Sequence, residues 1–307
     1  MSVSRLVDVV PVVEPAELIA GLVPPPRFDA VRFDTYRPNP AEPTQAAALA
    51  TLTGFAELIA TPPRTGWFRR SAPAGPGGVY LDGGFGTGKT HLLASLWHAA
   101  PGPKAYGTFV EYTHLVGALG FAGTVERLSQ HRLLAVDEFE LDDPGDTMLM
   151  SRLLGQLAEA GVRLAATSNT LPGKLGEGRF AAEDFRREIR SLSDRFETVR
   201  IDGPDFRHSG LARAPEPGAA AAVAAAAAAT PGATLDEQDG LTRRLAALHP
   251  STYGRLVEST ATAYFLDVRP LADQSAALRW VVLIDRLYDR QVPVRSSGVP
   301  WDQLFTP

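Results

Sequence analysis

A glycine loop that ends in a lysine is the first feature of this chain that could do chemistry. Four glycines fall within residues 83–88, and one of only three lysines follows them directly in VYLDGGFGTGKTHLLASL (79–96). The spacing Gly83-x-x-x-x-Gly88-Lys89-Thr90 is complete, with a β-prone apolar run before it and apolar residues at helical spacing after it. A strand, a glycine loop and a helix N-terminus together form the context in which backbone N–H groups bind phosphate.

The loop therefore predicts a nucleotide site. We expect Lys89 to reach the β- and γ-phosphates and Thr90 to bind Mg²⁺ through its hydroxyl. The residues expected to bind the phosphates are Gly83, Gly84, Phe85, Gly86, Thr87, Gly88, Lys89 and Thr90. The alternative is an ordinary glycine-rich turn between a strand and a helix, and the complete pattern argues against it.

Two acids follow a second apolar run in HRLLAVDEFELDD (131–143). A buried parallel strand that ends in Asp137 and Glu138 would place both carboxylates at the carboxyl edge of the sheet, where doubly wound folds bind ligands. We expect Asp137 to hold the hydration shell of Mg²⁺, and Glu138 to accept a proton from the water that attacks the γ-phosphate, or to orient that water. The alternative is a strand capped by solvated acids.

A third strand is expected in VRLAATSNT (162–170), ending in Thr167, Ser168 and Asn169. Because parallel strands end side by side, Asn169 would hydrogen-bond the γ-phosphate and the attacking water, as a sensor of intact nucleotide. Ser-Asn at a strand end also suits a turn or a helix cap.

Arginines are concentrated in GRFAAEDFRREIRSLSDRFETVRIDGPDFR (178–207). The candidates for an arginine that enters a neighbouring subunit's site are Arg179, Arg186, Arg187 and Arg190, of which we favour Arg179 and Arg186. Most of the four must be ordinary solvated helix residues. FETVRIDG indicates a last strand of the core. Upstream, Tyr36 and Gln45 are candidates to contact the base, or they simply pack an N-terminal helix.

Composition describes an ordinary globular protein. The chain has 307 residues, with 45% hydrophobic and 21% charged residues and a net charge of −5. It contains no cysteine, which excludes disulfides, thiolate nucleophiles and zinc–thiolate sites. The N-terminus carries acids and prolines where a signal peptide needs an apolar core, and the alanine run at 218–234 is too short to span a bilayer. We expect a cytoplasmic protein with no transmembrane segment.

The alanine run also suggests how the chain is divided. Proline and glycine flank it at both ends, and it has no amphipathic face, so we interpret it as a linker rather than a packed helix. The expected parts are an N-terminal extension (1–27), a core (28–212), an alanine/proline/glycine-rich linker (213–234) and a C-terminal α/β region (235–307).

The C-terminal region repeats a pattern of the core. Residues 263–297 follow residues 133–167 at a constant spacing, with Asp267 on Asp137, Leu283 on Leu153 and Val292 on Val162. Both segments predict strand, acid, amphipathic helix and strand. Either the C-terminal region holds a unit like the acid-bearing half without a phosphate loop, or two α/β units share a hydrophobic pattern.

The chain resembles the ZapE family, AAA+-type ATPases of bacterial cell division with mitochondrial relatives. The resemblance lies in YLDGGFGTGKTHLL, in LLAVDEFELDDPGDTMLMSRLLGQLAEAGVRLAATSNTLPGKL and, near the end, in VVLIDRLYDRQVPV, and covers about residues 28–307 outside the alanine run. It implies a doubly wound parallel α/β sheet of the P-loop, AAA+ type with a C-terminal α/β extension. It also implies ATP hydrolysis and association with FtsZ at the division site. On this mapping Lys89 and Thr90 belong to the first nucleotide motif, Asp137 and Glu138 to the second, and Asn169 is the sensor.

The function we expect is Mg²⁺-dependent ATP hydrolysis coupled to remodelling of a protein partner, FtsZ or another protein polymer, by an ATP-dependent homo-oligomer. The first alternative is a nucleic-acid-associated AAA+ ATPase of the helicase-loader type. An acidic chain with few aromatics outside its core argues mildly against DNA. The second is a small-molecule kinase, although paired acids and a sensor asparagine fit hydrolysis better, so we expect no metabolite substrate other than ATP. The chain has no Asn-Lys-x-Asp motif for guanine.

Overall fold

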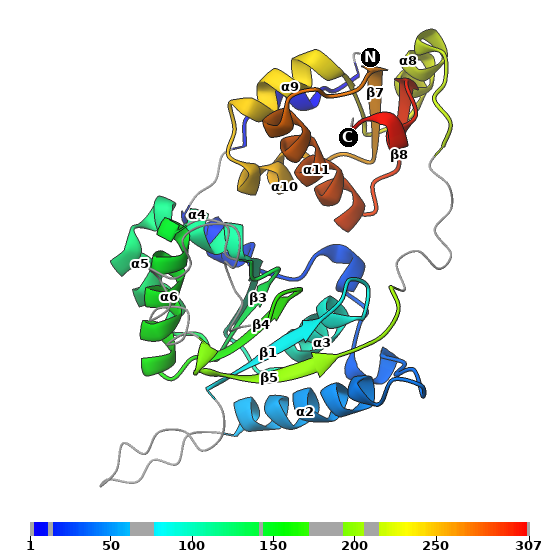
Figure 1. Cartoon of the computed structure of the whole chain (residues 1–307). Helices are drawn as coiled ribbons and strands as arrows, with labels where there is room; N and C mark the ends of the chain where they lie inside the picture. Colours follow the sequence, from blue (N-terminus) through cyan, green and yellow to red (C-terminus); the bar gives the residue numbers. More distant parts are fainter. Residues whose placement is uncertain are drawn as a thin grey trace, which may run out of the picture. The chain divides into compact units, whose positions relative to one another are not determined.

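The computed structural model of the protein forms two compact units, which are described separately (Figure 1). It describes residues 3–11, 15–61, 77–140, 144–171, 193–205 and 215–305. The phosphate-loop unit comprises Glu14–Pro24 and Phe28–Gly210, and the C-terminal unit comprises Met1–Val13, Pro25–Arg27 and Leu211–Pro307. The first residues of the chain therefore cluster with its last residues.

The phosphate-loop unit is built on a parallel sheet with the strand order β2-β3-β4-β1-β5. The strands are β1 (Gly78–Gly83), β2 (Lys104–Thr108), β3 (Leu133–Asp137), β4 (Arg163–Ser168) and β5 (Phe196–Ile201). All neighbouring strands in it pair in parallel. Because β4 lies between β1 and β3, the end of β4 stands between the phosphate loop and the end of the acid-bearing strand.

Helices cover both faces of this sheet (Figure 1). One face packs against α4 (Phe109–Leu119), α5 (Phe121–Leu128) and α6 (Pro144–Glu159), with α1 (Pro15–Ala20) beside them, and the other face against α2 (Pro43–Ala60) and α3 (Lys89–Ala99). Within β3, Leu134 and Val136 join the first core and Leu133 and Ala135 the second. Because both faces of the sheet are buried, the sequences of its strands are continuous apolar runs rather than alternating patterns. The predicted doubly wound α/β fold is confirmed.

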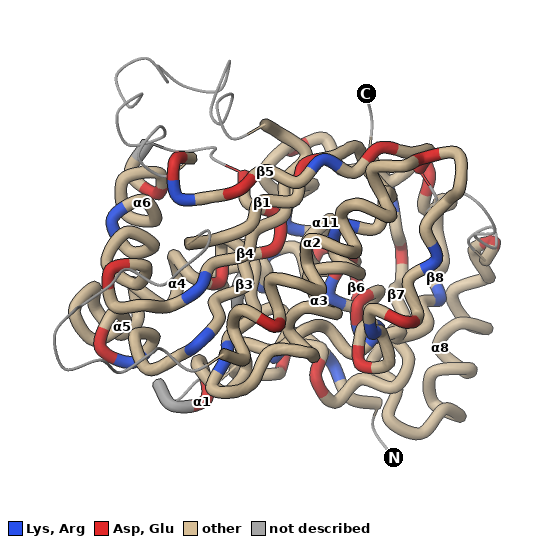
Figure 2. The backbone as a smooth tube through the Cα atoms, turned by 90° about the horizontal axis from the view of Figure 1, so that it is seen from below, with Lys and Arg blue, Asp and Glu red and all other residues tan. Residues whose placement is uncertain are grey.

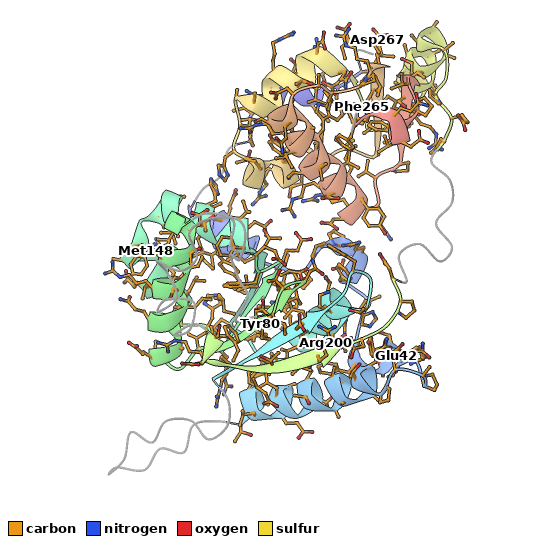
Figure 3. The ribbon with its side chains drawn as sticks, in the orientation of Figure 1. Glu42, Tyr80, Met148, Arg200, Phe265 and Asp267 are labelled. Atoms are coloured by element: carbon orange, nitrogen blue, oxygen red, sulfur yellow. The ribbon has the colours of Figure 1, made fainter. Side chains whose placement is uncertain are left out.

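The C-terminal unit is a smaller α/β structure with a three-stranded parallel sheet in the order β6-β7-β8. Its elements are α8 (Ala220–Ala229), β6 (Ala233–Glu237), α9 (Gln238–Ala246), α10 (Tyr253–Leu256), β7 (Thr262–Val268), α11 (Gln274–Asp289) and β8 (Val294–Gly298). Phe265 of β7 lies in a core with Trp280 of α11 (Figure 3). Leu6 is buried in the same core, and Asp236 accepts hydrogen bonds from the backbone of Leu6 and Val7. The N-terminal segment is thus part of this unit.

The alanine-rich segment is a packed helix, so its interpretation as a linker was wrong. In α8 the side chains of Val223 and Ala227, one turn apart, are buried and pack with Tyr264 of β7. Alanine has the highest helix propensity, and its methyl group lets a helix approach a sheet closely. Apart from Val223, every residue of α8 is alanine, so sequence periodicity could not show which face of the helix is buried.

This packing predicts a sharp difference between two neighbouring alanines of α8. Ala227→Asp should destabilise the C-terminal unit by about 3 kcal/mol or more, because it buries an unpaired charge at a position that is 1% exposed. Ala228→Asp, at an exposed position of the same helix, should change stability by less than about 0.5 kcal/mol. Urea unfolding of the full-length variants measures both. Equal effects at the two positions would contradict a buried face on α8.

The predicted strand–helix–strand unit near the C-terminus is present, as β7, α11 and β8. The resemblance to the phosphate-loop unit extends to β6 and to the connections between elements. Arg132 N donates to Pro103 O and Ala261 N to Gly232 O, both at 2.8 Å, at the starts of matching strand pairs. The pairing register matches as well, with Lys104 beside Leu133 and Ala233 beside Thr262.

Unusual backbone conformations recur at matching places. Gly161 after α6 and Gln291 after α11 both have positive φ, and the next residue in each case bonds back into its helix. Glu138 and Asp267 are non-glycine residues with φ of 54° and 56° at the ends of β3 and β7. Asp267 is labelled in Figure 3. In conformation Asp267 therefore matches Glu138 rather than Asp137. These correspondences support a repeated unit over a merely shared hydrophobic pattern.

Candidate functional site

The phosphate loop joins β1 to α3 as the sequence predicts. Gly86 and Gly88 have φ of +67° and +92°, which side chains other than glycine rarely adopt. A Cβ at Gly86 would come within 1.7 Å of Asp205 Oδ1, and one at Gly88 within 2.8 Å of the Tyr36 ring. Both glycines are required by conformation and by space.

Lys89 lies at the start of α3 with its ammonium turned back into the loop. Its Nζ donates to Gly83 O at 2.8 Å, Gly84 O at 2.6 Å and Asn169 Oδ1 at 3.0 Å. The side chain is 8% exposed. These three acceptors are uncharged oxygens, and an ammonium placed beside the loop suits the binding of phosphate.

Asp137 is oriented by three hydroxyl groups. Its Oδ1 accepts hydrogen bonds from Thr90 at 3.3 Å and from Thr167, and its Oδ2 accepts one from Tyr106 at 2.7 Å. These donors come from α3, β4 and β2, so elements on either side of β3 fix the carboxylate. Thr90 and Asp137, the two predicted Mg²⁺ ligands, thus lie side by side.

Glu138 is held in an exposed, left-handed conformation at the end of β3. Its backbone N–H donates to Thr167 Oγ1 at 3.1 Å. The next residue, Phe139, donates its N–H to Thr167 O at 2.7 Å and is fully buried, in edge contact with Phe109 and Tyr80. Burial of Phe139 offsets the conformational strain at Glu138, which is of order 1–2 kcal/mol. The acid consequently points out of the core.

Asn169 follows β4 and meets the ammonium of Lys89. Its neighbour Thr170 is anchored through its carbonyl, which accepts a hydrogen bond from Tyr80 OH at 2.7 Å. Burial raises the pKa of Tyr80, so this hydroxyl stays protonated and available as a donor. The structure thus brings Lys89, Thr90, Asp137, Glu138 and Asn169 to one edge of the sheet.

Other predicted site residues have different positions. Arg179 and Arg186 lie outside the described residues, and their role stays a prediction. Tyr36 donates its hydroxyl to Thr87 O at 3.3 Å and covers the loop at Gly88. Gln45 is buried, and its amide bonds Asn39 N and Asp202 O. Both ends of that amide already have protein partners.

Sequence reasoning missed three contributors to the site: Tyr106, Glu140 and Asp205. Tyr106 could not be found without knowing that β2 lies beside β3. Glu140 stood in the acidic stretch after β3, but only the Asp137-Glu138 pair received a role. Asp205, which follows β5, lies against Gly86 only because β5 pairs with β1.

The donor set fits Mg²⁺ bound together with phosphates. Mg²⁺ takes oxygen ligands, keeps several waters and usually binds one or two carboxylates plus substrate phosphate. The hydroxyl of Thr90 and the carboxylate of Asp137 offer such oxygens beside the phosphate loop. Among the described residues no group of three or more histidine, aspartate or glutamate side chains could hold a metal alone.

Comparison with known proteins identifies the family of the chain. The family model of the AFG1-like ATPases matches residues 12–230 and 212–306. The chain belongs to this family. Membership in the AFG1-like ATPases, a family named for ATPases, confirms the predicted family resemblance.

Curated relatives are similar over part of their length. The Cell division protein ZapE of Escherichia coli (strain K12) is 28% identical over 149 residues, which are 45% of this chain and 40% of that protein. An uncharacterized protein of Schizosaccharomyces pombe is 29% identical over 154 residues, 44% of this chain and 34% of that protein. The chain thus matches less than half the length of these relatives.

Solved structures share a more distant likeness. AMPPCP-bound DnaA from Aquifex aeolicus has 15% identity and a TM-score of 0.43, covering 56% of this chain and 50% of that one. The DnaC helicase loader has 18% identity and a TM-score of 0.40, covering 57% and 99%. Within the described residues, no helix is both long and apolar enough to cross a bilayer.

Proposed function

We propose that this AFG1-like ATPase hydrolyses ATP with Mg²⁺ and uses the energy to remodel a protein polymer in cell division, with FtsZ the first candidate. The observation that carries the hydrolytic part is the convergence of Lys89, Glu138 and Asn169 at one sheet edge. The division role is supported by the ZapE relative and by the sequence resemblance.

In the proposed mechanism each residue has a separate task. Lys89 exchanges its carbonyl partners for the β- and γ-phosphates when ATP enters the loop. Asn169, which accepts a hydrogen bond from Lys89 at 3.0 Å, contacts the γ-phosphate and the attacking water. Glu138 orients that water and takes its proton as the bond to the γ-phosphorus forms, while ADP leaves.

Thr90 and Asp137 would hold Mg²⁺, whose charge would offset that of the phosphates. Three hydroxyl donors already fix the Asp137 carboxylate, so its orientation does not depend on the bound ion. Tyr106 and Thr167 are therefore expected to support this ligand without touching the nucleotide.

The proposed assembly is an ATP-dependent homo-oligomer, because hydrolysis in AAA+ proteins uses an arginine from a neighbouring subunit. Arg179 and Arg186 remain the candidates for that role. A nucleic-acid partner is less favoured because basic and acidic residues are interspersed over the described chain, as Figure 2 shows, and the net charge is −5. DNA-stimulated hydrolysis would reverse that preference.

The proposal predicts an ATP-dependent effect on division polymers. Purified FtsZ polymers are sedimented with the protein and ATP, using wild type, Glu138→Gln and Glu126→Gln. Glu126 is an exposed residue of α5 and serves as the matched control. We expect wild type and the control to change the polymer yield by at least about twofold, a difference that sedimentation resolves. Glu138→Gln should bind polymers without completing the change, because hydrolysis drives it.

Two other outcomes are informative. A change in yield that is equal for wild type and Glu138→Gln would separate polymer binding from hydrolysis and contradict the coupling. If the protein neither co-sediments with FtsZ nor changes its yield, FtsZ is not the partner. ATP hydrolysis measured with and without DNA would then test the helicase-loader alternative directly.

A further inference from the structure

Glu140 links the segments that follow β3 and β4, which are neighbouring strands of the sheet. It lies three residues beyond β3, and its carboxylate accepts three hydrogen bonds from the segment that follows β4. Ser168 Oγ donates to Oε1 at 2.7 Å, Asn169 N to Oε1 at 2.9 Å and Thr170 Oγ1 to Oε2 at 2.9 Å. One side chain therefore holds three consecutive residues, with Asn169 in the middle.

These contacts fix the residue that meets Lys89. The Asn169 side chain is exposed, and its Oδ1 accepts a hydrogen bond from Lys89 Nζ. Tyr80 holds the same segment from the other side through Thr170 O. Without Glu140, the backbone N–H of Asn169 would lose its hydrogen bond, and Ser168 and Thr170 would each lose one side-chain hydrogen bond, leaving Tyr80 to hold Thr170 O. A displacement of about 1 Å in a catalytic group can lower a rate by about a hundredfold.

The charge of Glu140 does not explain its presence. Its three partners are two hydroxyl groups and a backbone N–H, none of which carries a charge. The site needs a side chain of the length of glutamate. One of its end atoms must accept hydrogen bonds from Ser168 Oγ and Asn169 N, and the other must form a hydrogen bond with the hydroxyl of Thr170. A glutamine meets that need, since its carbonyl oxygen accepts from Ser168 and Asn169 while its amide N–H donates to the hydroxyl of Thr170.

We propose that Glu140 is a positioning residue that holds Asn169 within reach of the γ-phosphate by hydrogen bonding rather than by charge. This inference rests on the proposed role of Asn169 in ATP hydrolysis. It gives different roles to two acids that are only two residues apart, because Glu138 acts through its charge and its proton affinity whereas Glu140 acts through its hydrogen bonds. Glutamine should inactivate position 138 and be tolerated at position 140.

The test measures kcat and the ATP dissociation constant for Glu140→Gln, Glu140→Asp and Glu140→Ala in the full-length protein. We expect Glu140→Gln to keep kcat within about threefold of wild type. Glu140→Asp and Glu140→Ala should lower kcat about 10- to 100-fold, with ATP affinity changed less than about threefold. The aspartate keeps the charge but is one methylene too short, so the comparison holds even if the alanine variant does not fold. Glu126→Ala on α5 is the control.

Asn169→Ala links the inference to the site. It should lower kcat as much as Glu140→Ala does, and the double variant should be no worse than either single variant. Activity in Glu140→Asp combined with inactivity in Glu140→Gln would show a role for charge and overturn the proposal. So would additive losses in the double variant. Normal activity in Asn169→Ala would instead refute the proposed role of Asn169, which is a separate result.

Discussion

Glu138→Gln is expected to lower kcat for ATP hydrolysis by about 10²- to 10⁴-fold, the range for loss of a general base. ATP binding should change little, because the phosphates are held by the loop and by Lys89. Glutamine preserves size and can still hydrogen-bond water, but it cannot accept a proton near neutral pH. Phosphate release under saturating ATP measures the loss, and equilibrium binding of a fluorescent ATP analogue measures the affinity.

The structure explains why this glutamate is suited to the task. Phe139 anchors the chain immediately after it in the core formed with α4 and α6. Thr167 Oγ1 accepts a hydrogen bond from the backbone N–H of Glu138 and donates one to the Asp137 carboxylate. One threonine of β4 thus positions both acids. The backbone at Glu138 is thus determined by buried neighbours, while its side chain faces solvent.

The control for this experiment is Glu126→Gln, which alters an exposed glutamate on α5 and should leave kcat unchanged. If Glu138→Gln hydrolysed ATP at the wild-type rate, another group would have to act as the base. A parallel loss of ATP affinity would instead indicate that the substitution disturbs the phosphate loop. Only a large fall in kcat at constant affinity supports the proposed role.

Local sequence patterns predicted that the phosphate loop, the two acids and Asn169 would lie at one edge of the sheet. Each of them is a short spacing next to one strand, and the carboxyl ends of parallel strands must meet at one edge. The contact between Lys89 and Asn169 could not be predicted, because it requires β4 to lie beside β1. The hydrogen bond of Tyr106 to Asp137 likewise depends on the pairing of β2 with β3. Sequence spacing is local, whereas strand order is set by the packing of the whole unit.

The alanine-rich helix shows another limit. Proline and glycine at both ends of a run of small residues suit a linker as well as a capped helix. What decides between them is the surface of β7 on which Val223 and Ala227 pack, and that surface is formed by residues far along the chain. The strand–helix–strand pattern of the C-terminal unit was visible in sequence because strands and amphipathic helices each leave a periodic signal, whereas the sequence left open whether this pattern repeats a unit of the core.

Lys89→Ala is expected to weaken ATP binding by about a hundredfold. Hydrogen bonds to charged groups contribute about 1.5–3 kcal/mol each, so loss of the contacts to two phosphates removes about 3 kcal/mol, and 1.4 kcal/mol corresponds to a factor of ten. Lys89→Arg should not restore binding, because a planar guanidinium does not reproduce the compact point charge that Lys89 places at Gly83 O and Gly84 O. Titration of the fluorescent ATP analogue gives both dissociation constants.

Lys104→Ala is the matched control for this prediction. Lys104 also donates to backbone carbonyls, those of His98 and Ala100, and its ammonium lies over the ring of Trp97 at the far end of α3. Removing it deletes a lysine with similar partners and leaves the phosphate loop intact, so ATP affinity should stay within about twofold of wild type, the ordinary error of such a titration. An equal loss of ATP affinity in Lys89→Ala and Lys104→Ala would mean that both lysines act by stabilising α3. A loss confined to Lys89→Ala would assign the effect to the ammonium at the loop, because the two lysines differ chiefly in what their charges face.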